Sequence, residues 1–119
     1  MLFIGDGIEV NLQDAAYYCK NAADKGNSKV MNNYANMLKD GVGVEPNIPE
    51  AIRYYKMSIA KGESYAMNNY ANMLKYGVGV DINTPEAIKY YRMAIEKGNS
   101  ASMNTYANIL KNGDGVEIN

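Results

Sequence analysis

Apolar side chains recur along this chain at the spacing of one helical face, and the pattern returns with a constant period. In residues 28–40 they stand at positions i, i+3, i+4 and i+7, as Met31, Tyr34, Ala35 and Leu38. This spacing places them on a single stripe of an α-helix, with polar residues on the remaining surface. The same pattern follows one and two periods later, so the sequence predicts three helices of this first type.

A second helix type alternates with the first. In residues 50–61, the stripe that it would bury is formed by Ala51, Tyr54, Tyr55 and Ser58. Copies of this helix are expected over residues 14–25 and 86–97. Thr84 and Pro85 are predicted to begin the last copy, because a hydroxyl can cap the first turn and proline fits the first helical positions.

Glycine marks the period and shapes the turns. Gly26, Gly62 and Gly98 lie 36 residues apart, and a fixed period of ~20 to 50 residues is typical of stacked repeats. Between the two helix types the chain reads Gly-x-Gly-Val, as in residues 41–44, which predicts a turn with left-handed backbone angles. A phosphate-binding loop is the alternative, but no strand precedes the motif and no lysine follows at the required spacing. The sequence therefore predicts an all-α solenoid of about three 36-residue helix–turn–helix repeats.

Both ends of the chain fall inside a repeat. Residues 1–2 and 5–8 match the end of a first-type helix and its Gly-x-Gly turn, and Asn119 matches the residue just before a second-type helix. We therefore expect one domain over residues 1–119, a piece of a longer array. Neither end carries a polar capping helix, so the exposed terminal repeats are expected to promote self-association. The expected parts are a partial repeat, two full repeats and a second partial repeat, at 1–27, 28–63, 64–99 and 100–119.

Composition excludes several classes of function. The net charge is −1, whereas a nucleic-acid binder needs a cationic surface. No apolar run reaches the ~18 residues of a membrane span. The chain contains no histidine, which removes histidine-based nucleophiles and zinc sites, and its cysteine and carboxylates do not cluster at ligand spacing. We expect a protein that is not an enzyme, with no catalytic residue, metal or cofactor, and with neither nucleic acid nor membrane as a partner.

Cys19 is the only cysteine, so the chain cannot form an internal disulfide, which suits a reducing compartment. It occupies the position that Tyr55 and Tyr91 take in the other copies. Because that position lies on an apolar face, a buried structural thiol is predicted. We expect a cytoplasmic location, with the lumen of the endoplasmic reticulum as the alternative.

The repeat resembles that of a known family. Residues 66–80 read Ala-Met-Asn-Asn-Tyr-Ala-Asn-Met-Leu-Lys-Tyr-Gly-Val-Gly-Val, and residues 85–98 read Pro-Glu-Ala-Ile-Lys-Tyr-Tyr-Arg-Met-Ala-Ile-Glu-Lys-Gly. Over essentially the whole chain, this pattern resembles the Sel-one-like repeat (SLR) family, a branch of the tetratricopeptide superfamily. The resemblance implies a right-handed α/α superhelix whose first-type helices line a concave surface, and a role as scaffold or adaptor. A cysteine-rich branch associated with penicillin binding has paired cysteines in each repeat, so that activity is not expected here.

Asparagine recurs at fixed positions on the first-type helices. Asn32 and Asn36 are one turn apart, on the side of the helix opposite Tyr34 and Leu38. In the SLR geometry the pairs would stack as a ladder along the concave groove, and an amide offers both the donor and the acceptor that suit a peptide backbone. In tetratricopeptide relatives, asparagines on this face contact ligand peptides in this way. Because packed helices lie ~8–10 Å apart and an extended peptide advances ~3.3 Å per residue, one pair would serve about three peptide residues.

Lysines and tyrosines add to this predicted surface. Lys39 and its copies form a parallel row that favours an acidic segment or a terminal carboxylate, although lysine in a last turn also complements the helix dipole. Tyr65 and Tyr76 are candidate aromatic anchors for a partner. The predicted peptide-binding residues of the concave face are Asn32, Asn33, Asn36, Lys39, Tyr65, Asn68, Asn69, Asn72, Lys75, Asn104, Asn108 and Lys111.

Other interpretations stay open at this point. Duplication copies residues whether or not they have a role, and the asparagines could instead face solvent or join neighbouring repeats by hydrogen bonds. An RNA-binding helical repeat and a ligand-free architectural spacer, of the kind found in designed repeats, are the alternatives to a protein-binding scaffold. If the asparagines bind a peptide, replacing Asn68 and Asn72 by alanine should weaken partner capture and leave the melting temperature nearly unchanged.

Overall fold

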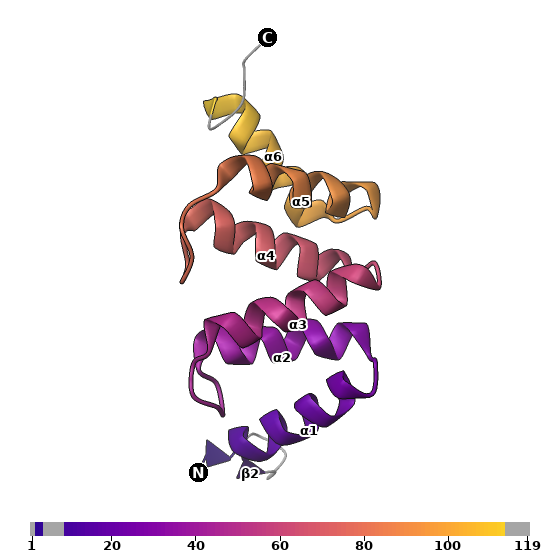
Figure 1. Ribbon diagram of the computed structural model, residues 1–119, viewed down its shortest axis with the longest axis vertical. Helices are drawn as coiled ribbons and strands as arrows, with labels where there is room; N and C mark the ends of the chain where they lie inside the picture. The colour runs from indigo at the N-terminus through magenta and orange to yellow at the C-terminus, as the bar shows by residue number, and fades with distance from the viewer. Residues whose placement is uncertain (1, 4–8, 114–119) are drawn as a thin grey trace. The chain divides into compact units, whose positions relative to one another are not determined.

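The computed structural model describes residues 2–3 and 9–113, which form six α-helices and one two-stranded ladder (Figure 1). The helices alternate between the two predicted types, which confirms the all-α repeat fold. The second type comprises α1 (Leu12–Asp24), α3 (Ile48–Ala60) and α5 (Thr84–Glu96). The first type comprises α2 (Ser28–Asp40), α4 (Ser64–Tyr76) and α6 (Ser100–Asn112).

The chain divides into two compact units, Met1–Ser58 and Ile59–Asn119. The first unit holds α1, α2 and all but the end of α3. The second holds α4, α5 and α6.

Asparagine caps begin most of the helices. The Oδ1 atoms of Asn11, Asn47 and Asn83 accept hydrogen bonds from the backbone N–H three residues on, at 3.0, 3.1 and 3.2 Å. Each second-type helix therefore begins about two residues earlier than predicted. The predicted cap at Thr84 is wrong, because Asn83 takes that role and Thr84 is already helical.

Glycine ends the first-type helices, as the pattern predicts. Gly41 and Gly77 adopt left-handed φ angles of 73° and 71°, and their N–H groups bond to carbonyls in the last helical turn. Gly43, with φ 74°, lies against the start of α1. A Cβ atom at this position would stand 2.1 Å from the carbonyl oxygen of Leu12. This close approach and the left-handed angle together require glycine.

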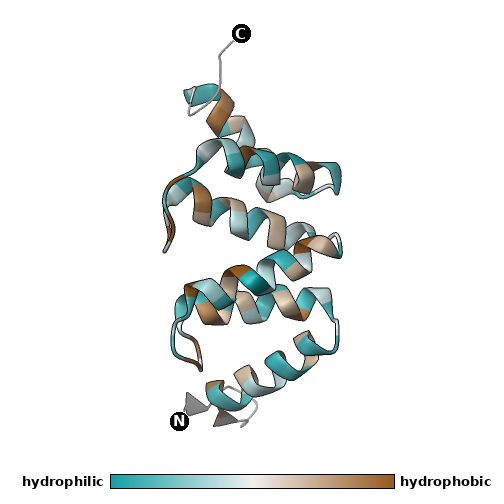
Figure 2. Cartoon of the chain, viewed as in Figure 1, coloured by the Kyte–Doolittle hydropathy of each residue, from teal (hydrophilic) through white to brown (hydrophobic). Residues whose placement is uncertain are grey.

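The predicted apolar stripes form the cores of the two units. In α2 the stripe is buried, and the equivalent stripe of α4 is buried too. Tyr34 of α2 packs edge-to-face on Tyr54 of α3 at 4.9 Å, and Tyr70 of α4 packs on Tyr90 of α5 at 5.2 Å. Figure 2 shows apolar and polar residues alternating along each helix, as expected for helices that bury one side.

The beginning of the chain differs from the prediction. Leu2 belongs to strand β1 (Leu2–Phe3), which pairs antiparallel with β2 (Glu9–Val10), and is not the end of a helix. The backbone of residues 2–3 is extended, and its hydrogen-bonding groups pair with those of residues 9–10 and not with a helical turn. The predicted turn at residues 5–8, the last copy of the Gly-x-Gly-Val turn and the match at Asn119 lie outside the described residues.

Neither a membrane span nor a metal cluster occurs in the part of the chain that the structure describes. None of its helices combines the length and the apolar character needed to cross a bilayer. Over residues 2–3 and 9–113, His, Cys, Asp and Glu do not gather in groups of three that could hold a metal ion.

Candidate functional site

Two of the predicted asparagines accept hydrogen bonds from buried tyrosines. The hydroxyl of Tyr55 in α3 donates to Asn36 Oδ1 in α2, and the hydroxyl of Tyr91 in α5 donates to Asn72 Oδ1 in α4 at 2.5 Å. Both tyrosine side chains are fully buried. The asparagine at this repeat position therefore satisfies a hydroxyl that would otherwise be costly to bury.

Burial also keeps these hydroxyls protonated. Removal from water raises the pKa of Tyr55 and that of Tyr91 well above the ordinary range for tyrosine. Each hydroxyl thus remains a hydrogen-bond donor to its asparagine at any physiological pH.

The first asparagine of each pair, Asn32 in α2 and Asn68 in α4, also takes part in packing. Ser102 in α6 is fully buried, and its hydroxyl donates to Asn68 Oδ1 in α4 at 2.7 Å. Asn32, the equivalent residue in α2, is buried with 7% of its surface exposed. Asn68 therefore joins two successive first-type helices.

The prediction that the asparagine pairs occupy a face not used in packing is wrong for Asn32, Asn36, Asn68 and Asn72. A first-type helix contacts its neighbours over more than one side. In the second unit, α4 meets α5 through the Tyr70 side and meets α6 through the Asn68 side. A single apolar stripe in the sequence does not predict this second contact, because polar hydrogen bonds form part of it.

The remaining predicted residues vary in exposure. Asn33, Asn104, Asn108 and Lys111 are exposed, and Asn69 is half-buried. Lys39 is half-buried and lies 3.8 Å from a carboxylate oxygen of Asp40. The Nζ atom of Lys75 stands 4.4 Å from the centre of the Tyr76 ring, a cation–π contact.

One face of α4 collects aromatic and amide side chains. Tyr65 and Tyr76 are 62% and 60% exposed. Asn69 and Asn72 lie between them, and helical geometry places all four within an arc of about 60°. We call this set, Tyr65, Asn69, Asn72 and Tyr76, the α4 face.

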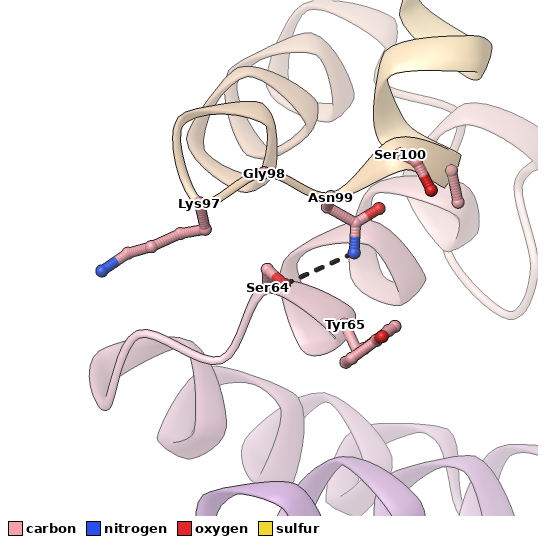
Figure 3. Close-up of a pocket in the computed structure, with 7 residues that line it drawn as sticks. Ser64, Tyr65, Lys97, Gly98, Asn99 and Ser100 are labelled. Atoms are coloured by element: carbon pink, nitrogen blue, oxygen red, sulfur yellow. Dashed lines mark hydrogen bonds between the residues drawn. The ribbon is translucent and has the colours of Figure 1, made fainter.

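A small pocket adjoins the Tyr65 end of the α4 face. Its volume is about 210 Å³, and its walls come from the start of α4, the α5–α6 turn and the start of α6. Figure 3 shows Asn99 directed at Ser64, with Tyr65 and Lys97 on either side. Asn99 Nδ2 lies 3.4 Å from Ser64 Oγ, while Asn99 Oδ1 caps α6 by accepting from Ser102 N at 2.9 Å.

Of the residues that line the pocket, only Tyr65 was predicted from the sequence to bind a partner. The other lining residues lie around the turn between successive repeats. In the sequence, the repeat pattern indicates this turn only as the boundary between two helices. The available signal was the drift at one repeat position, which is Lys29, Tyr65 and Ala101 in successive copies. Both Tyr65 and Ala101, from this position in two successive copies, line the pocket.

A charged network in the first unit has a structural role. Asp24 accepts hydrogen bonds from Lys20 Nζ at 2.8 Å and from the Tyr54 hydroxyl at 2.6 Å. These two donors hold the pKa of the Asp24 carboxyl below its ordinary value. Arg53 pairs through two nitrogens with Glu50 at 2.9 Å and stacks over the Tyr54 ring. The network links α1 to α3.

Comparison with known families decides the classification of this fold. The model of the Sel1 repeat matches residues 1–27, 28–63 and 64–99. The chain belongs to the Sel1 repeat family. A search of curated protein sequences found no match.

Two solved structures are similar to this Sel1 repeat chain. A Sel1 repeat protein from Oxalobacter formigenes shares 27% identity, with a TM-score of 0.87 over 97% of this chain. A protective antigen with an SLR fold, present in uropathogenic Escherichia coli strains, shares 26% identity, with a TM-score of 0.86 over 95% of this chain. The chain spans 47% of the first protein and 24% of the second.

Sel1 repeat proteins generally serve as scaffolds for protein–protein interaction and are generally not catalytic. The α4 face and the pocket beside it fit that general role, because they form a surface of aromatic, amide and ammonium groups.

Proposed function

We propose that this protein is an interaction scaffold that binds an extended segment of a partner protein across α4 and α6 of the second unit. The observation that carries the proposal is the α4 face. It exposes two tyrosine rings on the same side of one helix, with asparagine amides between them. Exposed tyrosines are frequent anchors in protein interfaces, because the ring supplies apolar area and the hydroxyl a hydrogen bond.

The surface continues from α4 onto α6. The Ser102–Asn68 hydrogen bond holds the two helices together, and the pocket is lined by both Tyr65 and Ala101. On α6, Asn104 and Asn108 are exposed one turn apart. Their amides can donate to and accept from the backbone of a peptide whatever its sequence.

Three lysines give this surface positive charge, which favours an acidic partner. Lys97 and Lys111 are exposed, and Lys75 is half-buried beside Tyr76. We propose that the bound segment is acidic, because carboxylates would pair with these ammonium groups at the edge of the site.

The proposal is specific to the second unit. In α2 the positions equivalent to Tyr65 and Tyr76 are Lys29 and Asp40. Because neither of these two residues is aromatic, α2 lacks the exposed anchors that distinguish α4.

A peptide-display library tests the proposal. Binders selected on the chain should be enriched in Asp and Glu, and Tyr65→Ala should weaken their binding about tenfold, measured as Kd by fluorescence anisotropy. Tyr17→Ala is the matched control, because Tyr17 is 61% exposed on α1, against 62% for Tyr65. Equal loss in both variants, or the failure of the library to yield a binder, would overturn the proposal.

A further inference from the structure

The pocket beside Tyr65 presents hydrogen-bond donors and no carboxylate. Its polar side chains are one ammonium, one amide and three hydroxyls, from Lys97, Asn99, Ser64, Tyr65 and Ser100. Glu63 and Glu96 adjoin lining residues in the sequence but do not line the pocket. A cation would therefore meet no negative charge on these walls, whereas an anion would meet an ammonium and several neutral donors.

Asn99 is the fixed donor of the pocket. Its side chain is buried, with 7% of the residue exposed, and its Oδ1 atom is held by Ser102 N at 2.9 Å. The Nδ2 atom is therefore directed at Ser64 (Figure 3). It lies 3.4 Å from Ser64 Oγ, which is long for a hydrogen bond.

This long bond leaves donor capacity on both partners. Asn99 Nδ2 carries two hydrogens, and the Ser64 hydroxyl, which accepts in the bond, keeps its own hydrogen to donate. A carboxylate oxygen placed beside the two atoms would accept from both. Hydrogen bonds to an ionised acceptor are roughly twice as strong as those between neutral groups.

Lys97 supplies the charge. It is exposed, and it forms no ion pair with any residue in the part of the chain that the structure describes. A Cβ atom on Gly62 would stand 3.3 Å from Lys97 Nζ, so the ammonium lies beside the turn that precedes α4. Its flexible four-carbon stem lets it swing toward an anion held by Asn99 and Ser64.

The size of the pocket indicates what part of a ligand it holds. Its volume is about 210 Å³. Sites for whole small molecules have volumes of ~300–1,000 Å³, and one water molecule occupies ~30 Å³ of the liquid. The pocket therefore has room for the head group of one side chain and a few water molecules.

The preceding turn of the repeat has a different charge at the central position. One period earlier, Lys97 and Ser64 are matched by Lys61 and Ser28, but Asn99 is matched by Glu63. A carboxylate in place of the amide would repel an anion. The complete set of donors therefore occurs at the turn before α6 and not at the turn before α4.

We propose that this pocket binds one carboxylate side chain of the acidic segment that crosses α4 and α6. Asn99 Nδ2 and the Ser64 hydroxyl hold the carboxylate oxygens, and the Lys97 ammonium neutralises their charge. The inference rests on the proposed function for the source of the carboxylate, whereas the preference of the pocket for a carboxylate can be measured without any partner.

A titration with N-acetyl-glutamate N-methylamide, a blocked glutamate, tests the pocket by itself. Followed by heteronuclear NMR, it should shift the backbone amides of residues 64–65 and 97–101 saturably, with a dissociation constant on the order of 10 mM. Blocked glutamine has the same shape without the charge and should not cause this shift. The absence of a saturable shift, or equal shifts with glutamine, would overturn the inference.

Asn99→Asp separates recognition from the stability of α6. Aspartate also caps a helix, so the bond from Ser102 N is kept, but an anionic oxygen replaces the Nδ2 donor. Blocked glutamate should then bind at least tenfold more weakly, with unchanged circular dichroism. Asn27→Asp is the matched control, because Asn27 caps α2 in the same way in the first unit. Unaltered binding to Asn99→Asp would show that the pocket does not recognise the carboxylate.

Lys97→Met removes the ammonium and keeps most of the stem, and should weaken the binding of blocked glutamate about tenfold. Lys25→Met is its control, since Lys25 is exposed at the same repeat position in the first unit. Equal effects of the two changes would indicate a loss of general positive charge, which would contradict a specific role for Lys97.

The proposed function and this inference fail in different ways. If the peptide library yields no binder but blocked glutamate binds, the pocket is a carboxylate site and a segment across α4 and α6 is not its source. If peptides bind, replacing one of their Asp or Glu residues by the amide should weaken binding to the unaltered chain about tenfold, but not to Asn99→Asp. Equal losses in both chains at every acidic position would overturn the inference and leave the proposed function intact.

Discussion

At the scale of single residues, the repeated asparagines act within the fold. Asn72 accepts from Tyr91, and Asn68 accepts from Ser102. Both donors are fully buried, so the amides satisfy hydroxyls that have lost contact with water. In α4 both asparagines of the pair therefore have a role within the fold that needs no ligand, whereas Asn104 and Asn108 in α6 are exposed. Replacing Asn68 and Asn72 by alanine is therefore expected to lower the melting temperature, whereas the sequence alone predicted almost no change.

Asn72→Ala is expected to lower the free energy of unfolding by about 1–3 kcal/mol, because it leaves the Tyr91 hydroxyl buried without its acceptor. Tyr91→Phe in the same chain should recover part of that loss, since it removes the orphaned donor. Asn108→Ala is the matched control, because Asn108 holds the same repeat position but is exposed. Urea unfolding followed by circular dichroism measures all three, and equal losses at positions 72 and 108 would contradict this role.

The Asp24 carboxyl makes stability depend on pH. Its folded pKa lies below the ordinary value, first through the hydrogen bond from Lys20 and then through that from Tyr54. A depressed carboxyl pKa contributes stability above the unfolded value near 3.8, and the contribution is lost as pH falls through the folded pKa. Asp24→Asn should therefore reduce the loss of stability on acidification below about pH 4. The urea midpoint measured against pH checks this, with Asp81→Asn, an exposed carboxylate in a loop, as the control.

At the scale of elements, each helix is defined by its ends as much as by its stripe. Asn27 and Asn99 cap α2 and α6 through side-chain oxygens, at 3.1 and 2.9 Å from the bonded nitrogens. Glu63 stands at the equivalent place before α4 and makes no such bond. The central first-type helix thus begins without the cap that its two copies share.

Glu63→Asn is expected to raise the free energy of unfolding by about 0.5–1 kcal/mol, because asparagine supplies the missing acceptor at the first turn of α4. Asn99→Ala should have the opposite sign at the same repeat position. Thermal unfolding measures both. A lower melting temperature for Glu63→Asn would show that the glutamate has another role.

At the scale of the whole molecule, the two units each contain a buried core and one helix with exposed apolar side chains. In the first unit Tyr18 of α1 is 69% exposed, and in the second unit Met103 and Leu110 of α6 are 44% and 43% exposed. In repeat proteins, stability is the sum of the repeats and of the interfaces between neighbours. Helices with an uncovered side are held by fewer interfaces and should open more readily.

Hydrogen exchange should therefore show less protection in α1 and α6 than in α2 and α4. Exchange followed by mass spectrometry checks this. Uniform protection along the chain would argue against independent opening of these helices.

The local pattern was enough to predict the repeat, the two helix types and the left-handed turns. A helical stripe needs only the spacing of apolar residues, and a turn like that at Gly41 needs only a residue without a side chain. The bounds of α2 were predicted closely for this reason, while the strand at Leu2 was missed because it forms only by pairing with a second segment, β2.

The roles of the polar residues depended on the packed fold. Nothing near Asn72 in the sequence indicates that Tyr91, 19 residues on, donates to it. The pocket beside Tyr65 likewise needs the packed fold, because its lining joins residues 64–65 to residues 97–101. Spacing along a helix determines which residues share a side, but only the neighbouring helices determine which of those sides meets water.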